Sequence, residues 1–253
     1  MLKVVILGKS SRSTKMLNSV LKSNGFDTVF IEEQRDNNYL LIKNRIKRFG
    51  FFKVFGQLFF QVFSRIQASS KYTKARLNSI QEEIVEDLIA LQAEHVVVSV
   101  NDNEVIQHVL KLAPDCIILS GTRLLSNDFL NAMSVPIVNI HAGITPKYRG
   151  VHGGYWSLAE GDFSNFGSTI HIVDAGIDTG HILAQARPKV SHLDNFSTYP
   201  LLQMRAALEL LPEVLESLLA GTAEKKYSTC DSKLWSHPTI WEYIWIRMTK
   251  NVK

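Results

Sequence analysis

Short, mainly apolar runs alternate with longer amphipathic stretches, and this alternation limits the fold more than any other feature of the sequence. Each run has the length of a buried strand, and the stretches between them have the length and periodicity of helices. Strands separated by helices build a mostly parallel sheet with right-handed crossovers. We therefore predict an α/β protein with a Rossmann-like sheet and helices on both faces. The runs occupy residues 2–7, 26–31, 95–100, 116–119 and 135–140.

The length and composition are those of a soluble globular protein. The chain has 253 residues, 45% of them hydrophobic and 21% charged, which suffices to bury a real core. One α/β domain with a modest extension fits this length better than two full domains. We predict a catalytic domain over residues 1–195 with a basic, Phe-rich helical insertion at about 39–76. Residues 196–253 are predicted to form a long helix and a small aromatic-rich extension.

The cysteines and the first residues favour a cytoplasmic protein. Cys116 and Cys230 are far apart and lack metal-type spacing, so a reducing compartment is expected. Residues 1–10 suit a first buried strand better than a signal peptide. No stretch reaches the roughly eighteen apolar residues of a membrane span.

Residues 135–180 hold the densest set of groups able to do chemistry. The strand at 135–140 leads into Asn139 and His141, which point the same way because strand side chains alternate. Ligands bind at the carboxyl ends of strands in open α/β sheets. A turn-rich loop with two cations follows, and a second strand at 168–173 precedes a loop that carries Asp178. We expect the amide, the imidazole and the carboxylate to converge.

Each of these residues also suits an ordinary structural role, so the functional prediction rests on the ordered set and not on any single residue. Taken alone, Asn139 suits strand-end hydrogen bonding, His141 a semi-buried position and Asp178 a turn. Together they resemble the folate-dependent formyltransferases, most closely the sugar N-formyltransferase branch, with glycinamide ribonucleotide transformylase and the catalytic domain of methionyl-tRNA formyltransferase as relatives. The matching elements are Asn139-x-His141, the Pro-Lys-Tyr-Arg-Gly loop at 146–150, His171-x-Val173-Asp174 and Asp178-Thr179-Gly180.

The resemblance implies formyl transfer from 10-formyltetrahydrofolate, a co-substrate, to a primary amine, without a metal. It assigns catalysis to Asn139, His141 and Asp178. The loop after the strand at 116–119 resembles the family segment whose backbone meets the pterin, although an ordinary βα loop is the alternative. The cofactor-binding residues predicted in this way are Arg123, Leu124, Leu125, Val173 and Asp174, of which Asp174 is expected to shape the folate loop.

Acyl transfer to an amine sets requirements that the three catalytic residues can meet. The tetrahedral intermediate carries negative charge on oxygen, and Asn139 offers an N–H donor to it. His141 can donate a hydrogen bond and carry a proton. Asp178 can orient the imidazole, raise its pKa and hold a water that relays the proton. No covalent intermediate is required.

Two further groups of residues are predicted to bind the acceptor, the substrate whose amine receives the formyl group. Gly8, Lys9 and Ser10 open a helix, where free N–H groups suit an anion, although a plain βα turn is the alternative. In the transformylase branch this loop is Gly- and Ser-rich and ends in Asn, which is missing here. This departure counts against glycinamide ribonucleotide. The second group follows the cation loop, with a Gly-rich turn into a helix as its alternative, and comprises Lys147, Arg149, His152, Tyr155 and Trp156.

The acceptor is predicted by elimination. Methionyl-tRNA formyltransferases continue into a C-terminal barrel, for which this chain appears too short. We therefore expect a nucleotide-linked amino sugar, of the kind used in surface polysaccharides such as lipopolysaccharide O-antigen. Three alternatives stay open: a glycinamide ribonucleotide-type transformylase, a formyltetrahydrofolate hydrolase, and a non-enzymatic adaptor that keeps the fold and docks on membrane or RNA.

Residues 39–67 carry a stripe of aromatic residues among cations. Phe52, Phe55, Phe59 and Phe63 share one helical face, and residues 37–81 contain nine Lys or Arg and no acid. The stripe can pack on the core or on a second subunit of a homodimer, lie on a membrane surface, or contact RNA, and nucleic acid is the least favoured. The C-terminal aromatic residues suit local packing or a dimer contact better than stacking on a base or sugar.

Overall fold

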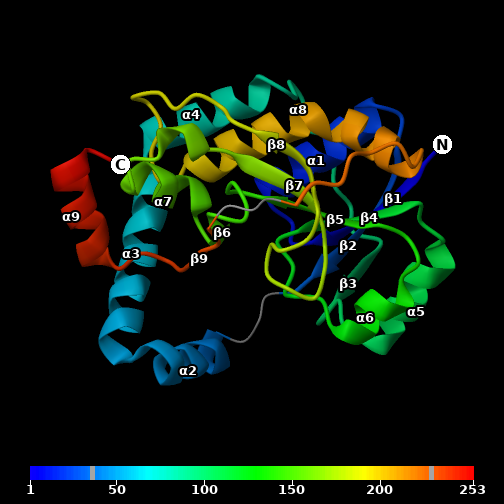
Figure 1. The fold of residues 1–253 in the computed structure, drawn as a ribbon, viewed down its shortest axis with the longest axis horizontal. Helices are drawn as coiled ribbons and strands as arrows, with labels where there is room; N and C mark the ends of the chain where they lie inside the picture. Colours follow the sequence, from blue (N-terminus) through cyan, green and yellow to red (C-terminus); the bar gives the residue numbers. More distant parts are fainter. Residues whose placement is uncertain (35–37, 228–230) are drawn as a thin grey trace.

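The computed structural model describes residues 1–34, 38–227 and 231–253, and of residues 38–41 only the backbone. Its centre is a seven-stranded sheet with the order β3-β2-β1-β4-β5-β7-β8 (Figure 1). The first five strands of this order run parallel, as predicted. The strands are β1 (Lys3–Gly8), β2 (Asp27–Glu33), β3 (His95–Val97), β4 (Cys116–Ser120), β5 (Ile137–His141), β7 (Ser168–Ile172) and β8 (Ile182–Ala186).

Helices cover both faces of the sheet (Figure 1). On one face, α1 (Arg12–Ser23) and α8 (Tyr199–Leu219) pack on the side chains of Val4 and Ile6. On the other face, α5 (Asn103–Leu112) and α6 (Asn127–Ala132) pack on Val5 and Leu7. Alternate residues of β1 thus belong to two separate hydrophobic cores, which explains why this strand is apolar throughout. The predicted α/β class is confirmed.

Strand β7 runs against the other strands of the sheet and thereby shapes the site. β7 pairs antiparallel with both β5 and β8, so that Asn139 lies opposite His171 and His141 opposite Thr169. The chain therefore passes the end of β5 twice, once along β5 and once along β7. The loop after β7 can return toward the same strand end.

A helical layer lies beside the sheet and contains the predicted insertion (Figure 1). Helix α9 packs on α3, and β6 pairs with β9 in a separate two-stranded sheet. None of the helices among the described residues is long and apolar enough to cross a bilayer. The elements of this layer are α2 (Asn38–Phe49), α3 (Phe51–Ser69), α4 (Lys71–Glu82), β6 (Arg149–Gly150), α7 (Gly153–Ala159), the short 3-10 helix η1 (Phe163–Asn165), β9 (Leu234–Trp235) and α9 (Ile240–Lys250).

The predicted aromatic stripe on α3 does not face the protein's own core. Helix α3 buries a different set of residues, which includes Phe60, 1% exposed, against Phe196 and Tyr243. Phe52 and Phe59, by contrast, are 80% and 56% exposed. Of the alternatives left open for the stripe, packing on the protein's own core does not hold, because the opposite face of the helix packs there, and packing on a second subunit stays a prediction.

Two other predictions concern the C-terminal part and the cysteines. Helix α8 contributes Leu202, Leu208 and Leu215 to the larger core cluster, so the core continues across the predicted boundary at residue 195. Cys116 is buried in β4, and burial raises its pKa to about 12. This thiol is therefore inert. Cys230 lies outside the described residues.

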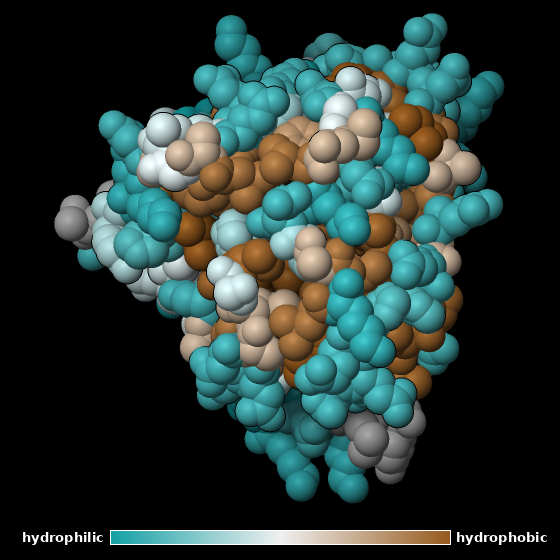
Figure 2. Space-filling view, turned by 90° about the vertical axis from the view of Figure 1, so that its right-hand side faces the viewer, coloured by the Kyte–Doolittle hydropathy of each residue, from teal (hydrophilic) through white to brown (hydrophobic). Residues whose placement is uncertain are grey.

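One face of the molecule, on the right of Figure 1, mixes apolar and hydrophilic side chains (Figure 2). Helix α5 lies on this side of Figure 1, and its Leu110 is exposed, as is Val98 on the segment after β3. Helices α3 and α9 lie on the far side in this view.

Candidate active site

Asn139, His141 and Asp178 converge at the carboxyl end of β5, as predicted. Asn139 and His141 share one face of the strand, and the loop after β7 brings Asp178 between them. The Asp178 Oδ2 atom lies 3.3 Å from Nδ1 of His141, and Oδ1 lies 3.5 Å from Nδ2 of Asn139. One carboxylate therefore contacts both predicted partners.

Asp178 is held in a strained and charged state. Its φ of 51° lies in the left-handed region, which costs a non-glycine residue on the order of 1 kcal/mol. Oδ2 accepts a hydrogen bond of 2.9 Å from the backbone N–H of Gly150. Burial pushes the pKa of Asp178 upward, but the neighbouring His171 and His141 imidazoles and the Gly150 N–H together bring the pKa below its ordinary value. The carboxylate is ionised at neutral pH.

The imidazole of His141 has a defined orientation. Its Nε2 atom lies 2.7 Å from the carbonyl oxygen of Tyr148 and therefore carries the hydrogen, because a carbonyl only accepts. Burial lowers the pKa of His141 and outweighs the opposing effects of Asp178 and the Tyr148 carbonyl. In the neutral form of the ring, the lone pair of Nδ1 faces the Asp178 carboxylate. A proton that arrives between these two atoms would find an acceptor on either side.

His171 completes the centre, although the sequence analysis gave it no role. Its Nδ1 lies 2.9 Å from the carbonyl oxygen of Ile172 and donates to it, and its Nε2 accepts from Nδ2 of Asn139 at 3.1 Å. Nε2 also lies 3.5 Å from Oδ1 of Asp178. The signal was present in His171-x-Val173-Asp174, but only the antiparallel register of β5 and β7 shows that His171 faces Asn139.

The predicted cofactor residues lie on the face of the sheet that carries Asn139 and His141. Leu125 and Val173 pack against the same small core cluster, whereas Leu124 is 64% exposed. Asp174 accepts hydrogen bonds from the backbone of Gly176 and from the Thr179 hydroxyl. This carboxylate shapes the loop that carries Asp178, as expected.

One residue predicted to contact the cofactor, Arg123, has its backbone N–H engaged within the protein. The backbone N–H of Arg123, assigned by resemblance to the pterin, donates a 3.0 Å hydrogen bond to the carboxylate of Glu33. The Arg123 guanidinium lies 2.5 Å from the same carboxylate. Glu33 is buried and also accepts from the N–H of Val100, so it needs these partners. In this structure the Arg123 N–H binds protein rather than a ligand.

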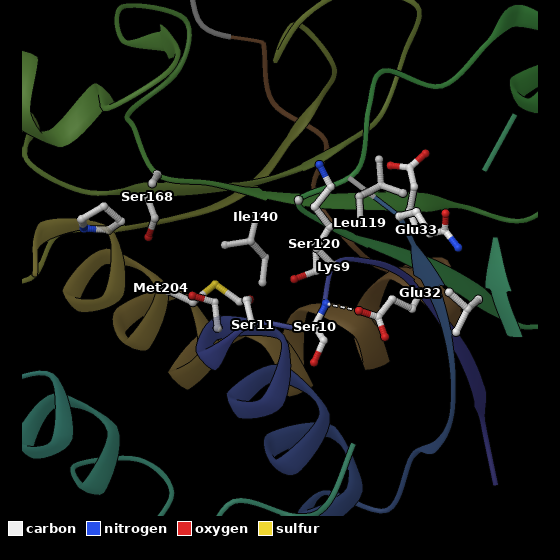
Figure 3. Close-up of a pocket in the computed structure, with 16 residues that line it drawn as sticks. Lys9, Ser10, Ser11, Glu32, Glu33, Leu119, Ser120, Ile140, Ser168 and Met204 are labelled. Atoms are coloured by element: carbon white, nitrogen blue, oxygen red, sulfur yellow. Dashed lines mark hydrogen bonds between the residues drawn. The ribbon is translucent and has the colours of Figure 1, made fainter. Parts of the chain in front are cut away.

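A cavity of about 530 Å³ lies on the other side of β5, toward α1 and α8. Ile140 and Ala142 line it, and these residues alternate with Asn139 and His141 along the strand. Figure 3 shows Ile140 from the sheet and Met204 from α8 pointing into this space. The end of β5 therefore separates this cavity from the face of the sheet on which Leu125 and Val173 pack.

The predicted anion site at the start of α1 is only partly present. Lys9 and Ser10 line the cavity, but Gly8 does not. A Cβ at position 8 would lie 2.2 Å from the carbonyl oxygen of Ser120, so Gly8 serves close strand packing. The Ser10 N–H donates a 3.3 Å hydrogen bond to Glu32 (Figure 3). With a carboxylate on this N–H, the helix start is not a simple phosphate cradle.

Lys147 and Arg149 connect loops around the centre. The Lys147 ammonium lies 2.6 Å from the Asp162 carboxylate. The Arg149 guanidinium donates a 3.1 Å hydrogen bond to the carbonyl of Ile177, next to Asp178. Arg149 therefore helps to fix the loop that presents the carboxylate.

His152, Tyr155 and Trp156, predicted to line the acceptor side, are buried in protein. The His152 ring lies 2.9 Å from Nδ1 of His237, and Trp156 stacks on Trp235 and donates to the carbonyl of Ser236. Tyr155 is 1% exposed. The C-terminal segment covers these rings, and their contact with the acceptor stays a prediction. The C-terminal aromatic residues thus serve local packing in part.

A cavity of about 50 Å³ touches Asp178 directly. Its wall includes Thr145, Gly180 and Tyr227. The space is large enough for one ordered water, and the carboxylate and the polar wall supply partners for it. A water in this position would contact the outer side of the catalytic carboxylate.

Among the described residues, one cluster has the side chains to hold a metal ion, and it lies outside this centre. Glu94, His95 and His108 bring their ligand atoms within 4.8 Å of one another beside β3. Neither Asn139, His141 nor Asp178 belongs to it. The absence of a metal from the reaction stays a prediction.

The fold and the position of the site define an α/β protein with polar residues gathered at the strand ends, where such folds bind ligands. The model of the formyl transferase family matches residues 56–215, more than half of the chain. The chain therefore belongs to the formyl transferase family, and with it to the transferases.

Among curated relatives, a methionyl-tRNA formyltransferase from Myxococcus xanthus (strain DK1622) is 34% identical over 119 residues. The match covers 46% of this chain and 37% of that protein. The chain thus spans about two fifths of the length of this relative.

Solved structures show the same fold over almost the entire chain. A sugar N-formyltransferase from Shewanella sp FDAARGOS_354 has a TM-score of 0.57 at 15% identity, covering 93% of this chain and 76% of that one. The formyltransferase PseJ from Anoxybacillus kamchatkensis, solved with UDP-4,6-dideoxy-4-formamido-L-AltNAc and tetrahydrofolate, has a TM-score of 0.51 at 17% identity and covers 92% and 85%. At these identities the likeness concerns the fold.

Proposed function

We propose that this protein is an N-formyltransferase that moves a formyl group from 10-formyltetrahydrofolate to the primary amine of a nucleotide-linked amino sugar, as in surface polysaccharide synthesis. The observation that carries the proposal is the position of Asp178. Its carboxylate joins His141, Asn139 and the Gly150 N–H in one buried constellation. A strained aspartate with three such partners is costly to maintain and has a clear use in acid–base chemistry.

Asn139 is the donor to the oxyanion in this proposal. One hydrogen of its Nδ2 is held by His171 at 3.1 Å, while the other faces Asp178 at 3.5 Å, a long hydrogen bond. The long bond is easily exchanged for a shorter one to a negatively charged oxygen. His171 acts as a positioning residue, because it holds the amide of Asn139.

His141 and Asp178 move the proton. The attacking ammonium must lose a proton before or during the attack on the formyl carbon, and the leaving nitrogen must gain one. Nδ1 of His141 and Oδ2 of Asp178 face each other at 3.3 Å, so a proton between them is shared by two acceptors. A water in the small cavity beside Asp178 would carry it to or from the site.

The residues near Asn139 fit the folate co-substrate in chemical character. Leu125 and Val173 offer apolar contacts on the face of β5 that carries the catalytic side chains. The co-substrate supplies an activated formyl group and a nitrogen leaving group when bound. The protein's part is to orient that group at Asn139 and to exclude water.

The acceptor is proposed to occupy the large cavity on the other side of β5. Its volume of about 530 Å³ and its mixed wall of Lys9, Ser10, Ile140 and Met204 suit a part-apolar, part-charged molecule. The similar sugar N-formyltransferases, which cover most of this chain, support an amino sugar. A second candidate, an aminoacyl-tRNA, is favoured by the curated sequence relatives.

The test is to mix the purified protein with 10-formyltetrahydrofolate and to follow tetrahydrofolate release with several acceptors. The panel holds amino-sugar nucleotides, glycinamide ribonucleotide and charged initiator tRNA, and one sample contains no acceptor. Turnover with one amino-sugar nucleotide alone supports the proposal. Turnover with the tRNA alone would mean that the acceptor is an aminoacyl-tRNA and not an amino sugar. Release of tetrahydrofolate without any acceptor would indicate a hydrolase. Failure to bind folate or to release it under any condition would refute formyl transfer.

A further inference from the structure

Helices α3 and α9 carry a continuous surface of exposed aromatic and aliphatic side chains, here called the aromatic surface. On α3, the members from Phe52 to Ile66 fall within an arc of about 100° around the helix axis. On α9, they recur at three- and four-residue spacing. The members are Phe51, Phe52, Phe55, Phe59, Val62, Phe63 and Ile66 of α3, and Trp241, Ile244, Trp245 and Met248 of α9.

The two stripes join because α9 packs directly on α3. A Cβ at position 56 would lie 2.2 Å from the Trp241 ring, so the glycine lets the indole lie against the α3 backbone. Phe63 of α3 contacts Tyr243 of α9 at a centroid distance of 5.4 Å. The result is a single exposed apolar surface, and contiguous surfaces of this kind mark interaction sites.

Cations border this surface and acids are scarce around it. Arg48 and Lys53 both lie over the ring of Phe49, at 5.1 and 5.8 Å from its centroid, beside the Phe51 end of the stripe. Arg65 is also exposed on α3. Residues 37–81 contain no acid, and in α9 the acid Glu242 is engaged in the helix cap with Thr239. The surface is therefore apolar at its centre and positive at its edge.

We propose that the aromatic surface binds the protein to an anionic lipid bilayer, with α3 and α9 lying in the plane of the interface. Phenylalanine and tryptophan enter the boundary between headgroups and acyl chains, while lysine and arginine reach the anionic headgroups. The inference does not depend on the proposed formyl transfer, since no catalytic residue belongs to this surface.

Charge distinguishes this occupant from a second copy of the chain. A symmetric dimer places the same patch against itself, so Arg48, Lys53 and Arg65 would meet a face to which residues 37–81 contribute cations and no acid. An anionic bilayer instead offers the opposite charge to these cations. A bilayer therefore matches the apolar centre and the positive edge at the same time.

The experiment is sedimentation of the full-length protein with vesicles of phosphatidylcholine, with or without phosphatidylglycerol, at low and high salt. We expect binding to the anionic vesicles that weakens as salt increases. The paired substitutions Phe55→Ser and Phe59→Ser should weaken binding by about tenfold or more, because two exposed rings no longer leave water. Arg48→Gln with Lys53→Gln should cost roughly fivefold for each charge removed.

The matched control carries Val98→Ser and Leu110→Ser, which remove exposed apolar side chains elsewhere on the molecule. It should bind as the unchanged protein does. Circular dichroism and thermal unfolding establish that each variant is folded. Sedimentation velocity and binding to a single-stranded RNA are measured in parallel.

Three results would overturn the proposal. The first is no binding to anionic vesicles. The second is binding that the aromatic substitutions leave unchanged. The third is a stable dimer, or an RNA complex, that those substitutions abolish while vesicle binding is absent.

Discussion

The proposed catalytic centre and the aromatic surface both depart from the usual distribution of polar and apolar groups. The first encloses polar groups, and the second exposes apolar ones. At the end of β5, ionisable groups such as His141 and Asp178 are buried. On α3, large apolar rings such as Phe52 and Phe59 are exposed. Buried polar groups cost free energy unless they are paired, and large exposed apolar patches are rare on monomers. Folding alone explains neither region, and we assign a function to each.

The difference lies in how each region is held. Asp178 has partners on every side, so its geometry is set by hydrogen bonds from several parts of the chain. The rings of the aromatic surface have contacts mainly with their neighbours on the same helices, as between Phe51 and Phe55. Substitutions in the first region should therefore damage chemistry, and those in the second should leave the fold and the chemistry intact.

The largest effect is expected from the catalytic acid and base. His141→Ala and Asp178→Ala should each reduce turnover by orders of magnitude, because each removes an acceptor of the shuttled proton. Steady-state release of tetrahydrofolate measures this. The exposed residue His192 provides a control, since His192→Ala should retain normal turnover. Near-normal rates in both catalytic variants would remove the basis for the assignment.

The next effect separates two adjacent phenylalanines. Phe60→Ala should lower the free energy of unfolding by about 3 to 5 kcal/mol, because the ring is fully buried against Phe196 and Tyr243. Phe59→Ala should change it by about 0.5 kcal/mol or less. Urea denaturation of both variants gives the comparison. Equal losses would mean that the aromatic surface is part of the core.

Asn139→Ala should raise the barrier to turnover by about 3 kcal/mol, the typical value of one oxyanion donor. The loss should appear mainly in kcat, because the donor acts on the negative oxygen of the intermediate. His171→Ala, which removes the group that holds the amide, should have a smaller effect in the same direction. An increase in KM alone would instead assign Asn139 to binding.

The smallest effect concerns acid stability and separates structural from catalytic histidines. Burial lowers the pKa of His152 to about 3 and that of His237 to about 4. The unfolded chain therefore binds more protons below pH 6.5, and stability should decrease as the pH falls from 6.5 toward 4. The loss should be about 1 to 3 kcal/mol for the pair at pH 5.5.

Urea midpoints at pH 7.5 and 5.5 measure this dependence. His237→Gln should flatten it, whereas substitution of the exposed His95 should not. A dependence unchanged by His237→Gln would show that other groups cause the acid sensitivity.

The sequence by itself determined the parts that depend on local pattern. The apolar runs predicted the parallel strands, because a strand with helices on both faces must be apolar throughout. The period of two predicted that Asn139 and His141 share a face. The ordered motif identified Asp178 as their partner, and the spacing of Phe52, Phe55, Phe59 and Phe63 identified one helical face. Such inferences need only the geometry of a single element.

Only the tertiary structure decided what each face meets. The period of α3 could not show whether the Phe59 face or the Phe60 face is buried, since that depends on where Phe196 and Tyr243 come to lie. In the sequence, His152 and Trp156 have the character of ligand-binding residues. In the structure, a distant segment that contains His237 and Trp235 covers them. The role of His171 required the antiparallel register of β7 on β5. Contacts between residues far apart in the chain are set by the packing of the whole molecule, and no local pattern encodes them.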